Sequence, residues 1–170
     1  MQHLLTLTLA GLAACGSSGS TPDTQDAPPA GTPTALSGTL GSLGATQATV
    51  SSLMIANSGE TLIYLSSSAI TCDQLTVSRW LGGTAAGSQV VELVLASPPT
   101  ASAFPVPPNE VNYAPGGMSS SHEVSADSGT ITFSSATPLV AVAGTVSAKF
   151  PSGSITGHFE ATYCANGQGY

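Results

Sequence analysis

The sequence predicts an all-β protein, an antiparallel β-sandwich with one short helix near Cys72. Apolar and polar residues alternate with the period of a strand through the segment that ends at Cys164. Only 6% of the residues are charged, which leaves few Lys, Glu or Arg to cover the exposed face of a helix. The apolar content of 41% still gives the 170 residues a core to bury, so we do not expect a disordered polypeptide.

The clearest strand signal runs from Gly129 to Cys164 and predicts three successive antiparallel strands. The residues expected to point inward share one parity in each strand; they are Ile131 and Phe133, then Val140, Val142, Gly144, Val146, Ala148 and Phe150, then Ile155, Gly157, Phe159, Ala161 and Tyr163. We expect a turn through residues 151–154, which would place Phe150 opposite Ile155. The pairs then mix large with small side chains, as in a curved sheet whose aromatic rings cover glycine positions.

Residues 1–14 are expected to form a lipoprotein signal peptide. The apolar run from Leu4 to Ala14 is too short to span a bilayer, and small residues and a cysteine follow it, as in a secretion signal. The tetrapeptide Leu-Ala-Ala-Cys that ends at Cys15 resembles the lipobox of bacterial lipoproteins. That resemblance implies cleavage before Cys15 and attachment of diacylglycerol to its sulfur, which anchors the protein in a membrane. The alternative is an ordinary secretion signal with a chance cysteine.

The lipidated cysteine begins a second region, residues 15–34, whose Gly, Ser, Thr and Pro content predicts a flexible tether. Gly16 after the cysteine resembles lipoproteins that are sent on to the outer membrane. Residues 35–170 are expected to form the β-sandwich domain. Its further strand signals are a weak one through Leu40 and Leu43, then Thr46–Ala56, Thr61–Ser66 and Ser88–Ala96, with a turn at Asn57–Glu60. Thr61–Ser66 is apolar on both faces, which predicts a central strand covered on each side.

The short helix is predicted from the spacing of Thr71 and Gln74, which matches a capping box. The helix would contain Leu75, Trp80 and Leu81 and would end at the two glycines that follow. Thr76 and Val77 would serve a strand as well, so that reading stays open.

Two cysteines are left once Cys15 is assigned to the export signal. Cys72 and Cys164 form an even pair in a compartment expected to be oxidising, which favours a disulfide over two independent buried thiols. A bridge closing so long a loop is worth roughly 4 to 5 kcal/mol in the chain-entropy model. Cys164 has the parity of His158 and Glu160, opposite the expected core set. Either a bulge precedes it, or the bridge lies across the outer face or the sheet edge.

The span from Pro98 to Asp127 holds six prolines and no sustained alternation, which predicts a long connection with few ladder hydrogen bonds. Its apolar residues either tuck against the sandwich or form an exposed patch for a partner. The residues considered for such a binding loop are Phe104, Tyr113 and Met118, with Val106 also in the span.

Residue types that could carry chemistry are present but are not framed by any motif. His158 and Glu160 share one strand face and could supply two metal ligands, and His122 beside Glu123 could add more, but only if the two pairs converge. The carboxylates that could form an acid-base pair are Asp73, Glu92, Glu110, Glu123, Asp127 and Glu160. The serines at 119–121 lack a glycine-framed nucleophile elbow. We therefore expect no enzyme activity, no metal and no cofactor.

Charge and aromatic content limit the classes of partner that the chain could bind. Arg79 and Lys149 are the only basic side chains against nine acidic ones, which argues against nucleic acid. Trp80 could stack on a sugar, although a lone Trp beside Leu81 is more typical of a core.

Ten residues of this chain fit a recurring pattern; they are Cys72, Gly129, Thr130, Gly144, Phe150, Gly153, Gly157, Phe159, Ala161 and Cys164. In these residues the chain resembles a group of small lipoproteins from myxobacteria and related soil bacteria. The resemblance implies a β-sandwich with a Cys72–Cys164 bridge and brings no catalytic residues. Our first hypothesis is a lipid-anchored, non-enzymatic structural or protein-interaction module of the outer membrane. The second is a carbohydrate-binding or adhesion module that uses Trp80, Tyr113 and the long loop from Pro98 to Asp127. A metal-dependent hydrolase ranks below both.

Overall fold

The computed structural model describes residues 34–40, 47–48, 51–57, 59–75, 88–115 and 123–165. The expected signal peptide and Cys15 lie outside these residues, as do Trp80, Met118 and His122. The strands are β1 Ala35–Gly38, β2 Gln47–Ala48, β3 Ser51–Asn57, β4 Glu60–Ser66, β5 Gln89–Leu95, β6 Ala103–Val106, β7 Glu110–Pro115, β8 Val124–Ser125, β9 Ser128–Thr137, β10 Ala141–Phe150 and β11 Gly153–Tyr163. The one helical segment in the described part is the 3₁₀ turn η1, Cys72–Leu75. The all-β prediction is confirmed, and no described helix is long and apolar enough to cross a membrane.

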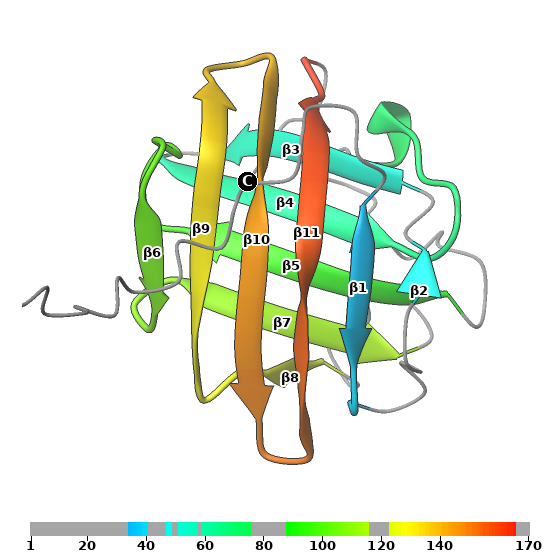
Figure 1. Ribbon diagram of the computed structural model, residues 1–170. Coiled ribbons are helices and arrows are strands. Elements are labelled where there is room, and N and C mark those ends of the chain that lie inside the picture. Colours follow the sequence, from blue (N-terminus) through cyan, green and yellow to red (C-terminus); the bar gives the residue numbers. More distant parts are fainter. Residues whose placement is uncertain are drawn as a thin grey trace, which may run out of the picture.

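The strands form one continuous hydrogen-bonded sheet in the order β6-β9-β10-β11-β3-β4-β5-β7-β8, with β1 beside β11 and β2 beside β1. Strands β9, β10, β11 and β1 form one layer, and β3, β4, β5 and β7 run crosswise behind it (Figure 1). The sheet curls over at the junction of β11 with β3, where Thr162 and Tyr163 pair with Leu53 and Met54 in parallel. The expected sandwich of two antiparallel sheets is therefore not confirmed, because the two layers belong to one mixed sheet.

The main core lies between the two layers of this curled sheet. Its fully buried side chains include Ile63, Leu65, Leu93 and Leu95 from the crosswise layer and Ile131, Val146, Phe150, Ile155 and Phe159 from the other. The Phe133 ring meets the rings of Phe104 and Phe159 edge to face, at centroid distances of 5.4 and 5.6 Å. Each such pair adds about 0.5–1.5 kcal/mol beyond the area that it buries.

The β9-β10-β11 meander is present as predicted, but the register of its last hairpin is two residues from the expected one. The turn contains only Pro151 and Ser152, so that Phe150 pairs with Gly153 and not with Ile155. Because side chains alternate with a period of two, this shift leaves the predicted inward set on the inward face. Val140 is the exception, since it lies in the β9-β10 turn and is 57% exposed.

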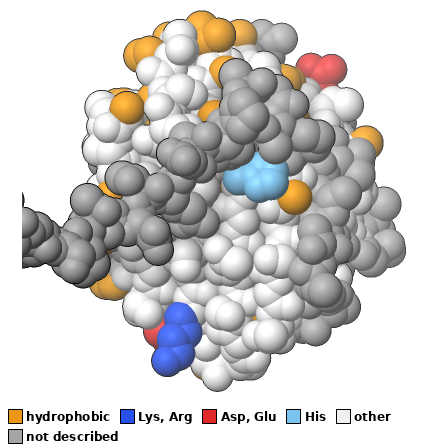
Figure 2. All heavy atoms as spheres, viewed as in Figure 1, with side chains coloured by type: hydrophobic (Ala, Val, Ile, Leu, Met, Phe, Trp, Pro, Cys, Tyr) orange, Lys and Arg blue, Asp and Glu red, His pale blue; other side chains and the backbone are white. Residues whose placement is uncertain are grey.

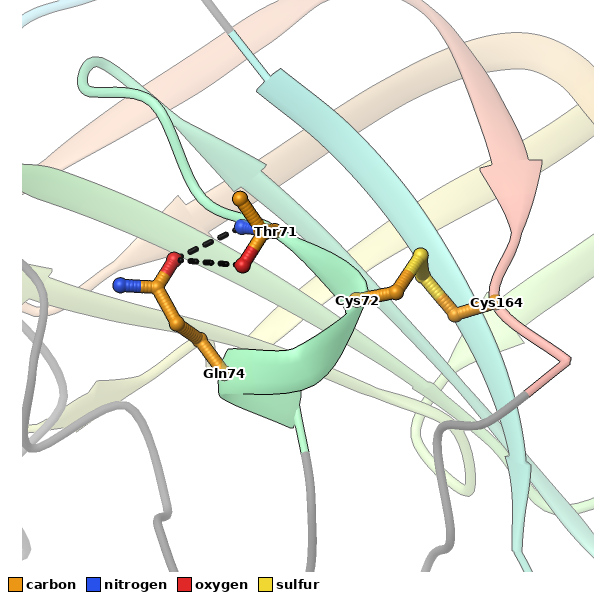
Figure 3. Close-up of a disulfide and its surroundings, with 4 residues drawn as sticks. All are labelled: Thr71, Cys72, Gln74 and Cys164. Carbon is orange, nitrogen blue, oxygen red and sulfur yellow. Dashed lines mark hydrogen bonds between the residues drawn. A yellow bond between two sulfur atoms is a disulfide. The ribbon is translucent and has the colours of Figure 1, made fainter.

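The crosswise layer is buried on both faces, as the sequence of β4 predicts. A second cluster covers its outer face and consists of Ile55, Leu62, Tyr64, Ile70, Leu75, Val90, Ala114 and Cys164. The predicted Cys72–Cys164 disulfide is present at the edge of this cluster, with the two Cα atoms 5.3 Å apart (Figure 3). The parity of Cys164 is thereby explained, because the bridge lies on the face opposite the main core.

The start of η1 resembles half of the predicted capping box. The Thr71 N–H donates to Gln74 Oε1 at 2.7 Å, as the box requires (Figure 3). The reciprocal bond differs, because the Thr71 hydroxyl donates to the same oxygen at 3.3 Å and the Gln74 N–H donates to the Thr71 carbonyl. The expected continuation of the helix to Trp80 lies outside the described residues.

The prediction of a long unpaired connection from Pro98 to Asp127 is wrong. Strands β6, β7 and β8 occupy much of this span, and β7 pairs with β5 over six residues. The prolines are compatible with this because Pro105 lies in β6, an edge strand, and Pro115 ends β7. Burial of β7 on both faces removes the alternation that sequence analysis looks for.

Candidate binding site

A pocket of about 390 Å³ opens at one end of the curled sheet, between the β3-β4 hairpin and the β9-β10 turn. It is lined by Met54, Ala56, Gly59, Glu60, Thr61, Pro98, Pro99, Pro138, Leu139 and Tyr163. Glu60 is the one charged residue in this lining. A concave, mostly apolar surface with few polar groups is the usual character of a binding pocket.

The β9-β10 turn carries exposed apolar side chains, one of which, Leu139, lines this pocket. Leu139 is 62% exposed and Val140 is 57% exposed. Hydrophobic side chains gather over this end of the molecule in the space-filling view (Figure 2). Two hydrogen bonds fix the turn: the Val140 N–H donates to the Thr137 carbonyl at 3.1 Å, and the Tyr163 N–H donates to the Val140 carbonyl at 2.8 Å. The apolar side chains are therefore presented to solvent by an ordered backbone.

Leu139 has a φ of 55°, in the left-handed region that side chains other than glycine rarely adopt. This conformation costs an L-residue of this kind about 1–2 kcal/mol. Strained, exposed apolar residues concentrate at sites that bind something, because packing within the fold does not account for them.

The edge of β3 beside the pocket offers unpaired backbone groups. The parallel pairing of β11 with β3 ends at Met54, whose carbonyl accepts the Cys164 N–H at 2.7 Å. Because Asn57 and Glu60 flank a two-residue hairpin turn, the alternation of antiparallel bonds directs the N–H and C=O of Ala56 away from β4. No backbone partner for these two groups lies within the described part of the chain. Ala56 itself lines the pocket.

The residues considered for a binding loop do not form a common surface. Tyr113 is 2% exposed within the main core, and Phe104 is half-buried against Phe133. Both are tucked into the fold, which was one of the two alternatives, and Met118 lies outside the described residues. The exposed apolar surface comes instead from the β9-β10 turn, in which alternation assigns only Val140 to the inward face of a strand.

The possible metal ligands are only partly placed. His158 and Glu160 lie two residues apart on β11 and are half-buried. The Glu160 N–H donates to the Thr34 hydroxyl at 3.0 Å, which ties β11 to the start of β1. Within the described residues, no three His, Cys, Asp or Glu side chains are grouped as metal ligands.

A second hollow, of about 510 Å³, lies beside the β10-β11 turn, with Lys149 and several hydroxyl side chains in its lining. Its single aromatic residue, Phe150, is 2% exposed and offers no ring face for stacking on a sugar.

Glu92 is a buried carboxyl group that sequence analysis named but did not single out. It lies on the outer face of β5, is 2% exposed, and has Tyr64 of β4 and Asn112 of β7 as its register partners. Asn112 Nδ2 donates to Glu92 Oε2 at 3.2 Å and to Glu110 Oε2 at 3.3 Å. Burial raises the pKa of Glu92 to about 7, and the charges of Glu123 and Glu110 add to the rise. The hydrogen bonds from Asn112 and Tyr64 act in the opposite direction and lower the pKa. A glutamate inside an otherwise apolar strand, QVVELVL, was the available signal.

Comparison with protein-family models, curated proteins and solved structures finds no match for this chain. The apolar pocket, the exposed turn and the β3 edge are therefore the observations from which a functional proposal starts.

Proposed function

We propose that this chain is a lipid-anchored, non-enzymatic interaction module of the bacterial cell envelope, and that it binds another envelope protein at the pocket beside the β9-β10 turn. The observation that carries this proposal is the exposed apolar residue Leu139, beside the similarly exposed Val140, in the lining of a pocket whose described residues include a single charged one. Apolar surface held in water by a strained, hydrogen-bonded turn gains free energy when a partner covers it.

The partner segment that suits this site is an extended peptide with an apolar side chain. The N–H and C=O of Ala56 can pair with a peptide backbone, while the pocket takes the side chain, as in strand-addition complexes. Charge complementarity further limits the partner. Glu60 at the pocket and the net charge of −7 would repel an acidic peptide.

The envelope location is supported by two separate features of the chain. The lipobox-like tetrapeptide ending at Cys15 would attach the tether of residues 15–34 to the outer membrane. The Cys72–Cys164 disulfide agrees with export, since such bonds persist in oxidising compartments. A carbohydrate-binding module has less support, because Tyr113 is buried and offers no ring to a sugar.

The anchor is tested by growing cells that express the full-length chain with a radiolabelled fatty acid. We expect label in the wild-type protein and none in Cys15→Ser. A wild-type protein without label would contradict the lipid anchor.

The binding site is tested by placing a photoreactive amino acid at position 139 in the full-length chain and irradiating intact cells. The matched control is the same substitution at Ser152, which is exposed in the β10-β11 turn, away from the pocket. We expect an adduct with another protein from position 139 and not from position 152. Adducts with lipid, glycan or a second copy alone, or equal adducts from both positions, would contradict the proposal.

A further inference from the structure

The outer face of β5 and β7 holds two buried oxygen atoms with no hydrogen-bond donor among the described residues. These are Glu92 Oε1 and Asn112 Oδ1, on side chains that are 2% and 4% exposed. The two residues are direct partners in the antiparallel register, so their side chains lie on the same face of the sheet. A buried acceptor without a donor destabilises the folded state, so two of them on paired residues require an explanation.

One hydrogen bond already joins the two groups, from Asn112 Nδ2 to Glu92 Oε2. The second oxygen of the carboxyl group and the amide oxygen both only accept while Glu92 is ionised. A single proton on Glu92 would turn that carboxyl oxygen into a donor and satisfy both atoms at once.

We propose that Glu92 is a proton-binding site, in which the neutral acid donates its O–H from Oε1 to Oδ1 of Asn112 while Asn112 Nδ2 donates to Oε2. One proton is taken from water, no bond other than O–H forms, and the carboxylate becomes a carboxylic acid. The resulting acid-amide pair joins β5 to β7 through two side-chain hydrogen bonds in place of one.

Burial and the neighbouring carboxyl groups favour the neutral acid, and together they outweigh the hydrogen bonds from Asn112 and Tyr64, which favour the ionised form. Among the described residues, the titratable groups that act on Glu92 are Tyr64 from β4, Glu110 from β7 and Glu123 just before β8. Two of these three are carboxyl groups, and burial with the charge of Glu110 also raises the pKa of Glu123. An ionised Glu92 would therefore hold a buried negative charge near two other carboxyl groups, whereas the proton removes that charge.

The consequence is that the folded domain becomes more stable as the pH falls from about 7 toward 4.5. The pKa of Glu92 in the folded state, about 7, lies above its ordinary value of 4.5. The stability that the proton contributes is fully present at a pH below the pKa of Glu92 in the unfolded chain. It is lost as the pH rises through the pKa of Glu92 in the folded state. Between the two values, the folding equilibrium constant falls roughly tenfold for each pH unit.

The test is denaturant unfolding of the wild type, Glu92→Gln and the control Asp127→Asn over a range from about pH 4 to about pH 9. Asp127 is exposed and is not one of the groups that shift the pKa of Glu92. Gln at position 92 keeps an N–H donor for Asn112 Oδ1 and has no proton to lose. We expect a slope of at least roughly tenfold per pH unit in the wild type and in Asp127→Asn, and its reduction in Glu92→Gln to the part that the raised pKa of Glu123 contributes. A wild type without the slope, or an undiminished slope in Glu92→Gln, would overturn the proposal.

A direct measurement is the carboxyl carbon resonance of Glu92, assigned by its disappearance in Glu92→Gln. We expect a titration midpoint near neutrality. A midpoint in the ordinary range of glutamate, about 4 to 5, would show that the carboxylate is ionised and would overturn the proposal even if stability varied with pH.

Discussion

Phe159 lies directly opposite Gly144 in the β10-β11 pair. A Cβ atom added at Gly144 would overlap the Thr132 carbonyl oxygen on β9, so any side chain at this position forces the backbone to shift. The large ring of Phe159 and the absent side chain of Gly144 together allow β9, β10 and β11 to curve over the core.

Gly144→Ala is therefore expected to destabilise the domain by about 1–3 kcal/mol, because backbone must shift to relieve the overlap. The measurement is the free energy of unfolding from denaturant titration. Gly59→Ala is the control for backbone conformation alone, since Gly59 has a φ of 100° but no atom within 4 Å of an added Cβ. An unfolding free energy of Gly144→Ala equal to that of the wild type would mean that β9 and β10 are not in this register.

Phe159→Ala is expected to lower the free energy of unfolding by roughly 3 to 5 kcal/mol, as for other buried aromatic residues. Phe159 is 1% exposed and meets the Phe133 ring edge to face. A denaturant titration that gives a loss below about 1 kcal/mol would place Phe159 outside the core.

Removal of the disulfide in Cys72→Ser with Cys164→Ser is expected to lower the free energy of unfolding by about 2–5 kcal/mol, because the bridge restricts an unfolded loop of 92 residues and covers the second cluster. Unfolding of the double variant is compared with that of the oxidised wild type. Two alkylatable thiols in the wild-type protein purified under non-reducing conditions would contradict the bridge.

Leu139→Gly is expected to raise the free energy of unfolding by up to about 1 kcal/mol, since glycine adopts a φ of 55° without the strain that leucine bears. Leu139→Ala is the control, because alanine keeps the Cβ atom and the strain. If both variants shift stability equally, strain at position 139 is not the cause. A stabilising loss of Leu139 would be in keeping with selection of this residue for binding.

Alternation along the chain predicts the faces of the strands better than their pairing. The hairpin of β10 and β11 keeps its inward residues despite the two-residue error in register, because a shift of two residues preserves the face. Turn length decides the register, and the Pro-Ser-Gly-Ser sequence at residues 151–154 allows more than one length.

The crosswise layer was harder to predict because it is buried on both faces. Strand β7 therefore lacks the period of two, and Glu92 and Asn112 place polar residues at positions where burial predicts apolar ones. No sequence motif marks Glu92 and Asn112 as a pair. They meet only because β5 and β7 are neighbours in the sheet.

The pocket could not be predicted from the sequence. Its lining comes from four separate places in the chain, represented by Met54, Pro98, Pro138 and Tyr163. These meet only because the sheet curls over where β11 joins β3. The alternation predicts that Val140 faces the core, so the exposed apolar pair of Leu139 and Val140 could not be expected from it.

The most direct test of the proposed binding site is the yield of protein adducts from a photoreactive residue at position 140 of the full-length lipidated chain. Ala56→Pro removes an N–H that β4 does not use, so it should lower this yield while the domain still folds. The account predicts an adduct with another envelope protein that is lost in Ala56→Pro. An unchanged yield in a folded Ala56→Pro variant, or no protein adduct from position 140, would contradict it.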